Sequence, residues 1–195
     1  MLPDTDVIAL ILAAGRGRRF GRDKRLARLP DGTPLLAASL AQARRCFAEV
    51  AVVLREDDDA QALGIPAEVR VIRCAEADLG MGHSLAAGAR ALRERPARAL
   101  AVLLGDMPWI AEGSLRRLAC AAEATHILFP RYRGERGHPV LFGRLFWGAL
   151  ETLEGDRGAR ELLQERPECC VAIDLDDPGV LRDVDSEAAL APETS

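Results

Sequence analysis

The feature that most constrains this chain is an apolar run that passes without a break into a basic, glycine-rich segment. Val7 to Leu12 is uniformly apolar, which is typical of a strand buried on both faces of a parallel sheet. From Gly15 to Lys24 the sequence contains three glycines, four arginines and one lysine. Glycine allows a backbone to approach a ligand closely, and clustered cations attract polyanions. The segment therefore predicts a phosphate-binding loop at a strand end, which is typical of a protein that handles a nucleotide.

Two common phosphate-binding motifs do not match this loop. A P-loop closes with Gly-Lys and then Ser or Thr, whereas here Gly21 is followed by Arg22. The dinucleotide-binding pattern would place its third glycine at position 20, which is Phe20. These mismatches argue against a simple ATPase and against a dehydrogenase. A surface turn that is merely rich in glycine and arginine is the remaining alternative.

Apolar runs alternate with helical stretches along most of the 195 residues. Strands are expected at 7–12, 50–54, 69–74, 99–104, 126–130, 139–142 and 170–175, and helices at 33–46, 57–63, 84–93, 145–153, 159–164 and 186–190. Thr33 is expected to cap the first helix, with Pro34 at its first position. The alternation predicts a mostly parallel sheet with helices on both faces, which is a Rossmann-like three-layer α/β/α fold in a single domain over residues 1–195.

Three glycine-containing loops, at Gly15, Gly80 and Gly105, each follow a predicted strand. Because the carboxyl ends of parallel strands share one edge of the sheet, we expect these loops to converge where open α/β sheets bind ligands. Gly80 and Gly82 precede a helix whose N-terminal amides favour anions. Ser84 either caps this helix or donates to a nucleobase.

Charge and residue content exclude several functional classes. The formal net charge is −4 in spite of the basic loop, which argues against nucleic-acid binding and favours a small anionic ligand. The five cysteines form no CxxC pair and the three histidines lack zinc-ligand spacing, so we expect free thiols in a reducing cytoplasm and no transition-metal site. The acidic amino terminus and its short apolar run predict neither a signal peptide nor membrane association.

Carboxylates follow the predicted strand 99–104 and recur near the carboxyl end. Asp106, in Gly-Asp-Met-Pro directly after that strand, suits a Mg²⁺ ligand, because Mg²⁺ takes one or two carboxylates together with substrate phosphates. A turn or cap aspartate is the alternative. Asp183 and Asp185 are expected on one side of a strand, where Asp185 either binds the same metal or only caps the helix that follows.

No arrangement of a protein nucleophile and its base is visible, since the chain lacks Gly-x-Ser-x-Gly and a plausible Cys–His pair. When a phosphate oxygen of one substrate attacks a phosphorus of another, the protein has only to align them and neutralise charge. Arg19, Lys24 and a metal would suffice, with pyrophosphate as the leaving group.

The opening loop resembles the Leu-x-x-Gly-x-Gly-x-Arg-x-Gly-x-x-Lys signature of GT-A-type nucleotidyltransferases at every specified position. More narrowly, six segments resemble the molybdenum cofactor cytidylyltransferase family of MobA-like NTP transferases and occur in that family's order. They are Leu12-Ala13-Ala14-Gly15, Gly80 to Leu85, Gly105 to Pro108, Arg136 to Pro139, Gly155 to Arg160 and Asp183-Val184-Asp185.

This resemblance implies transfer of CMP from CTP to molybdenum-bound molybdopterin, with release of pyrophosphate and with Mg²⁺ as cofactor. It implies catalytic roles for Arg19, Lys24 and Asp106, and metal binding by Asp106 and Asp185. The nucleotide would be bound by Leu12, Ala13, Ala14, Gly15, Gly17, Arg19, Lys24, Gly82 and Ser84, and the phosphorylated acceptor by Arg136, His138, Asp156 and Arg160. A transient contact with a molybdoenzyme or its chaperone is also implied. Related guanylyltransferases carry glycine where this chain has Ala14, which favours CTP.

Three other interpretations stay open. A guanylyltransferase would form the GMP form of the same cofactor, and a CTP-dependent transferase would use another small phosphorylated acceptor. A non-catalytic carrier would bind nucleotide and pterin and deliver them to a target enzyme. The carrier interpretation predicts that Lys24→Ala spares function, whereas an enzyme loses orders of magnitude in rate.

Overall fold

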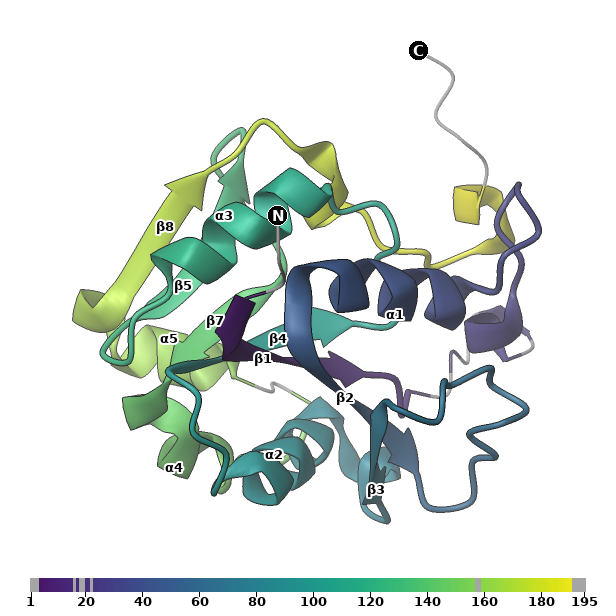
Figure 1. Cartoon of the computed structure of the whole chain (residues 1–195), viewed down its shortest axis with the longest axis horizontal. Helices are drawn as coiled ribbons and strands as arrows, with labels where there is room; N and C mark the ends of the chain where they lie inside the picture. Colours follow the sequence, from purple (N-terminus) through teal and green to yellow (C-terminus); the bar gives the residue numbers. More distant parts are fainter. Residues whose placement is uncertain (1–3, 16, 18–19, 22, 157–158, 191–195) are drawn as a thin grey trace.

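The computed structural model describes residues 4–15, 17, 20–21, 23–156 and 159–190, and its strands form one sheet (Figure 1). The strand order is β3-β2-β1-β4-β7-β5-β6, with β8 beside β5. The strands are β1 Asp4–Leu12, β2 Phe47–Arg55, β3 Arg70–Cys74, β4 Ala99–Leu104, β5 Ile127–Tyr132, β6 Glu135–Arg136, β7 Val140–Gly143 and β8 Cys170–Asp174. Neighbours from β3 to β4 are parallel, β7 is antiparallel to β4 and β5, β6 is antiparallel to β5, and β8 is parallel to β5. The mostly parallel α/β fold is thus confirmed.

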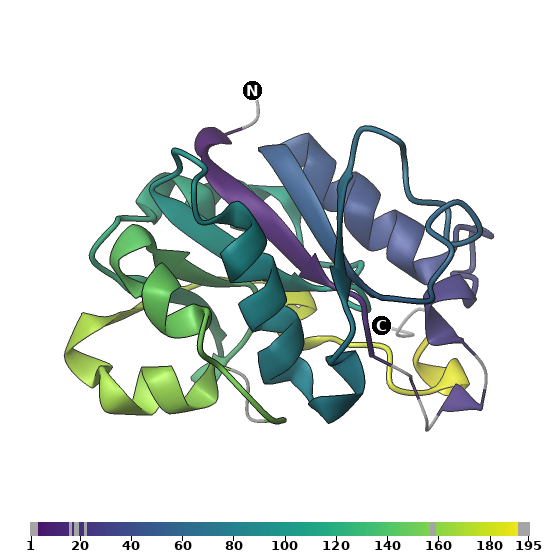
Figure 2. The same cartoon turned by 90° about the horizontal axis from the view of Figure 1, so that it is seen from below.

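Helices cover both faces of the sheet. Helices α1 Leu35–Cys46 and α3 Glu112–Ala121 lie on one face (Figure 1), and α2 Met81–Leu92, α4 Trp147–Leu150 and α5 Arg160–Glu165 lie on the other (Figure 2). Short 3-10 turns complete the described chain: η2 Lys24–Leu26, η3 Ala77–Leu79, η4 Arg144–Phe146, η5 Pro167–Cys169, η6 Pro178–Leu181 and η7 Glu187–Leu190. No helix among the described residues is long and apolar enough to span a bilayer.

The sheet separates two hydrophobic cores, and β1 contributes to both. Val7, Ala9 and Ile11 pack with α1 and α3, while Ile8 and Leu10 pack with α2. This explains why the run is apolar without alternation, because each side chain meets a helix layer on its own side. The strand fixes where the glycine-rich loop begins.

An antiparallel strand brings a distant segment to the same edge as this loop. Because β7 runs opposite to β4, Val140 pairs with Val102 near the end of β4. Residues 136–139, which precede β7, therefore lie at the edge where β1 and β4 end.

Several expected elements differ from the structure. Residues 57–63 form turns instead of a helix: the Asp59 carboxylate accepts the N–H groups of Gln61 and Ala62, as a helix cap would, but Gly64 with a φ of +70° ends the structure after one turn. Pro34, not Thr33, occupies the N-cap position of α1, and no side chain caps that helix.

The helix over 84–93 instead begins at Met81, so that Ser84 lies inside its first turn and does not cap it. Residues 145–153 contain η4 and the short α4, and the expected helix at 186–190 is a single 3-10 turn. Helix α3 was not expected at all, although Leu115, Leu118 and Ala119 give it an apolar stripe at helical spacing.

Candidate functional site

The three glycine loops surround one cavity at the edge of the sheet, as the order of strands predicted. Its volume is about 440 Å³. It is lined by residues from the ends of β1 and β4, the glycine loop with η2, the turn η3, the start of α2 and the segment after α4. They are Leu12, Ala13, Ala14, Gly15, Gly17, Lys24, Ala77, Asp78, Gly80, Met81, Ser84, Leu104, Gly105, Asp106 and Asp156. Most residues expected to bind the nucleotide therefore face one space.

Lys24 is the only lysine in the chain, and its ammonium group lies in this cavity. The Nζ atom is 2.5 Å from an Asp106 carboxylate oxygen and 3.9 Å from one of Asp185, and it also donates to the Val184 carbonyl at 3.2 Å. Lys24 opens η2, where the Asp23 side chain caps the turn. A compact ammonium at the end of a fixed turn is suited to bind a phosphate as a point charge.

Three carboxylates meet beside this lysine. Asp106, Asp183 and Asp185 each offer an oxygen, and these oxygens lie within 4.8 Å of one another. Residues 182–185 are not a strand, which corrects that expectation, and they reach the site because the Val184 N–H donates to the Asp106 carbonyl at 3.0 Å. Desolvation and the negative charges of Asp185 and Asp106 raise the pKa of Asp183. Crowded carboxylate oxygens of this kind fit a hard divalent cation such as Mg²⁺.

The start of α2 forms another wall of the cavity. Ser84 is 5 % exposed and lines the cavity. Gly80 has a φ of +128°, and a Cβ on it would lie 2.3 Å from the Gly155 carbonyl carbon. Gly82 does not line the cavity; its N–H donates to the Gly155 carbonyl at 2.8 Å. Both glycines thus allow α2 to dock closely on residues 154–156.

A second cavity of about 250 Å³ adjoins the first, since both are lined by Leu12, Met81 and Leu104. Its other apolar lining comes from α2, from α5 with its N-cap, and from the strands β4 and β7: Leu85, Val102, Val140, Phe142, Ala159 and Leu163. Its polar side chains are Arg136, His138 and Arg160, all expected at the acceptor side. Asp156, from the same prediction, lines the first cavity instead.

His138 lines this second cavity and has a ring nitrogen without a described hydrogen-bond partner. Its Nδ1 atom is buried, and no described group hydrogen-bonds to it. Burial lowers the pKa of His138, and the positive charge of Arg136 lowers it further, whereas the negative charge of Asp106 opposes the shift. The imidazole therefore favours its neutral form, in which one ring nitrogen can donate a hydrogen bond to a ligand and the other can accept one.

Sequence reasoning left some site residues unassigned. Arg19, expected to hold the triphosphate, lies outside the described residues. Asp183 was grouped with Asp185 but given no role, although its charge near two other carboxylates makes it part of the cluster. Arg25 and Arg55 contact the backbone of the glycine loop, and nothing in the local sequence indicates this.

Comparison with known proteins agrees with this geometry. The MobA-like NTP transferase domain model matches residues 9–169. The chain is 27 % identical over 190 residues to the purine catabolism protein PucB of Bacillus subtilis, covering 92 % of each chain. It is 31 % identical over 199 residues to nicotine blue oxidoreductase of Paenarthrobacter nicotinovorans, covering 94 % of this chain and 95 % of that one. It is also 38 % identical over 118 residues to a molybdenum cofactor guanylyltransferase of Rhodobacter capsulatus, covering 60 % of each.

The fold is similar to that of a solved relative that binds a divalent metal. The crystal structure of Rv0371C from Mycobacterium tuberculosis in complex with manganese superposes with a TM-score of 0.76 at 29 % identity, covering 95 % of each chain. With the family model matched from β1 to the start of β8, and with the loops, lysine and carboxylates gathered at one edge, this chain belongs to the MobA-like NTP transferase domain family.

Proposed function

We propose that this protein transfers CMP from CTP to the terminal phosphate of molybdenum-bound molybdopterin. An acceptor phosphate oxygen forms a new bond to the α-phosphorus of CTP, and the bond from that phosphorus to the α–β bridging oxygen breaks. Pyrophosphate leaves with the bonding electron pair, and the cytosine dinucleotide form of the cofactor remains. Delivery of this product would involve a transient contact with a molybdoenzyme or its chaperone.

One observation carries the proposal: a phosphate-type loop and a lysine–carboxylate cluster line one cavity, and a mainly apolar cavity with a basic rim adjoins it. The first suits a triphosphate, and the second suits a ring system that bears an anionic group. Because the two cavities share Leu12, Met81 and Leu104, two substrates bound in them would meet near the ends of β1 and β4. A transferase requires such adjacency of donor and acceptor.

Several polar groups in these cavities have a role in the proposed reaction. Lys24 would bind the triphosphate and stabilise charge that develops on its oxygens, as would Arg19. Asp106 and Asp185, with Asp183 beside them, are the residues that would hold Mg²⁺, which neutralises phosphate charge when bound. Arg136 and Arg160 would orient the acceptor phosphate, and the neutral His138 imidazole would hydrogen-bond the acceptor.

Ala14 supports CTP as the donor. Ala14 is 3 % exposed, packs on the α2 side of the sheet and lines the first cavity. Related guanylyltransferases have glycine at this position, so the methyl group reduces the room for a purine. GTP is the second candidate, favoured by the 38 % identity to a molybdenum cofactor guanylyltransferase.

The test is pyrophosphate release with each of the four nucleoside triphosphates, Mg²⁺ and molybdenum-loaded molybdopterin. We expect CTP to be used best and a CMP-containing dinucleotide to form. Ala14→Gly should shift the ratio of kcat/KM values towards GTP, while Gly113→Ala, on the surface of α3, should leave the ratio unchanged. A clear preference of the unaltered protein for GTP would refute the cytidylyl assignment. Turnover of CTP only with another phosphorylated compound would refute the acceptor.

A further inference from the structure

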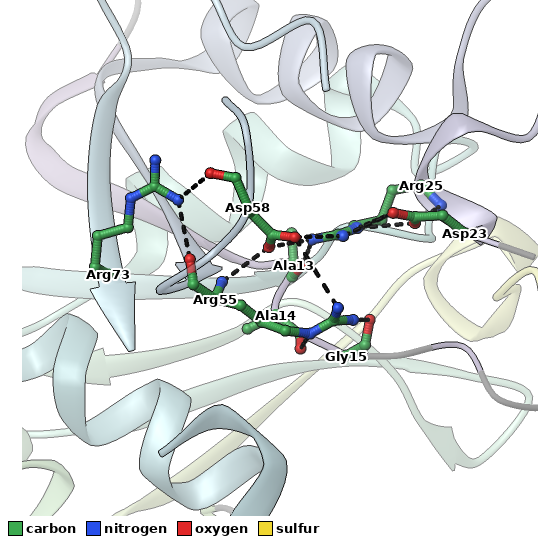
Figure 3. Close-up of polar contacts among 8 residues, drawn as sticks. All are labelled: Ala13, Ala14, Gly15, Asp23, Arg25, Arg55, Asp58 and Arg73. Atoms are coloured by element: carbon green, nitrogen blue, oxygen red, sulfur yellow. Dashed lines mark hydrogen bonds and ion pairs between the residues drawn. The ribbon is translucent and has the colours of Figure 1, made fainter. Parts of the chain in front are cut away.

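Two arginines outside the cavity hold the backbone of the glycine loop (Figure 3). Arg55, at the end of β2, donates from Nε to the Ala14 carbonyl at 2.9 Å and from Nη2 to the Gly15 carbonyl at 2.8 Å. Arg25 donates from Nη1 to the Ala13 carbonyl at 3.0 Å. Three consecutive carbonyls at the start of the loop are therefore bound by two guanidinium groups.

Two carboxylates hold the arginines in place. Arg25 makes paired hydrogen bonds to Asp58 at 2.5 and 2.7 Å, and its Nη2 bonds to Asp23 at 2.7 Å. The Arg55 backbone N–H also donates to Asp58, at 2.9 Å. We call this group the arginine clamp: Arg25 and Arg55 with Asp23 and Asp58. Asp58 connects its two arginines, since it contacts both.

The positive charges of the clamp arginines are neutralised by carboxylates of the same protein. Two guanidinium groups face two carboxylates, and the Arg25 residue is only 6 % exposed. Burial alone raises the pKa of Asp58, but hydrogen bonds from Arg25 and from the Arg55 N–H outweigh it and hold the pKa below its ordinary value. Unlike Lys24, which lines the cavity, Arg25 is therefore already fully partnered and is not a phosphate ligand.

The direction of these bonds bears on the nucleotide site. In a trans peptide the N–H points opposite to the C=O of the same unit. The N–H groups of Ala14 and Gly15 consequently point away from the clamp, and both residues line the cavity. Arg25 also follows Lys24 directly, so the clamp fixes the loop at Ala13 and again beside the site lysine.

We propose that Arg55 and Arg25 are positioning residues that keep the glycine loop in its nucleotide-binding shape before the nucleotide arrives. The role rests on the proposed nucleotidyl transfer. Without the clamp, binding would have to order the loop first, and ordering even one residue costs enough to weaken affinity by about tenfold.

The test compares Arg55→Met with Arg73→Met. Arg73 donates to the backbone carbonyls of Arg55 and Asp58, so it bonds the same segment, and it makes no hydrogen bond to the loop residues that the structure describes (Figure 3). Both variants lose one cation and side-chain bonds to two carbonyls. The measurements are the dissociation constant of CTP with Mg²⁺, KM and kcat separately, the melting temperature, and amide hydrogen exchange of Ala14 and Gly15 without nucleotide.

For Arg55→Met we expect a dissociation constant and a KM raised about tenfold, kcat changed less, and faster exchange of the two loop amides. Arg73→Met should bind CTP like the unaltered protein, and Arg55→Lys should be intermediate because a single ammonium nitrogen replaces the two guanidinium nitrogens that reach the loop carbonyls. Loss of melting temperature with unchanged CTP affinity and exchange would overturn the positioning role and leave only a structural one. Failure of the unaltered protein to bind any of the four nucleotides would instead refute the proposed function, and the positioning role with it.

Discussion

Replacing Gly82 by alanine is expected to destabilise the protein, although alanine is the better helix former. Gly82 is the second residue of α2, and a Cβ there would lie 2.5 Å from the Glu154 carbonyl oxygen and 2.9 Å from that of Gly155. These are backbone atoms, and the Gly82 N–H itself bonds to Gly155. The clash is therefore relieved only by moving α2 away from residues 154–155.

The size of the effect follows from overpacking at a tight contact. Inserting a methyl group into such a contact costs about 1–3 kcal/mol in free energy of unfolding. For a chain of 195 residues, each kcal/mol lowers the melting temperature by about 2–4 °C, so a fall of roughly 2–12 °C is expected. Because Met81 and Ser84 line the cavity, KM for the nucleotide should rise as well.

Gly113 provides a matched control. It is the second residue of α3, it is exposed, and a Cβ added to it would have no atom within 4 Å. Gly113→Ala should raise the free energy of unfolding by roughly 0.5–1 kcal/mol, because alanine restricts the unfolded chain. Both variants are measured by thermal and urea unfolding followed by circular dichroism. If Gly82→Ala proved as stable as Gly113→Ala, the close docking of α2 on residues 154–155 would be refuted.

Three further predictions concern charge. Because Lys24 is the only lysine, acetylation of amines modifies only Lys24 and the α-amino group. CTP with Mg²⁺ at ten times its dissociation constant should slow the labelling of Lys24 by about tenfold and leave that of the α-amino group unchanged. Lys24→Met should lower kcat by about 10²–10³ in a pyrophosphate-release assay. Asp185→Asn should weaken Mn²⁺ binding by about 10–100-fold in a titration, and chelation of divalent ions should abolish turnover. Asp58 has a pKa held below 3.8, so its stabilisation is complete above that pH and disappears as the pH falls through the lowered value. Urea unfolding should therefore show a stability gap between the unaltered protein and Asp58→Asn that is constant above about pH 4 and closes below it.

Local sequence was sufficient to predict the parts of the site that follow strands. Val7 to Leu12 is recognisable because a strand buried on both faces is apolar throughout, and the loops at Gly15, Gly80 and Gly105 converge because parallel strands end at one edge. The carboxylate cluster was predicted only in part. Asp185 was expected near Asp106, but through a strand, whereas an irregular segment held by the Val184 N–H brings it there.

Features that depend on contacts distant in sequence were not predictable. Asp58 looked like part of a short helix, yet its carboxylate is occupied by Arg25, 33 positions away in the sequence. Helix α3 was missed because Gly113 and two adjacent arginines obscure a narrow apolar stripe. No pattern within a window of ten or twenty residues indicates that Arg25 is buried behind the loop.

The alternation along β1 has a consequence for how this family can vary. Odd-numbered side chains from Val7 to Ala13 pack towards α1, and even-numbered ones from Ile8 to Ala14 pack towards α2 and the cavity. Inserting or deleting one residue within β1 would move every side chain on one side of the change to the opposite core. The alternation of side chains along β1 therefore places position 14, the residue proposed to discriminate between bases, on the cavity side of the sheet. Changes of length are tolerated only beyond the strand, so base choice can evolve by substitution at this position but not by sliding the strand.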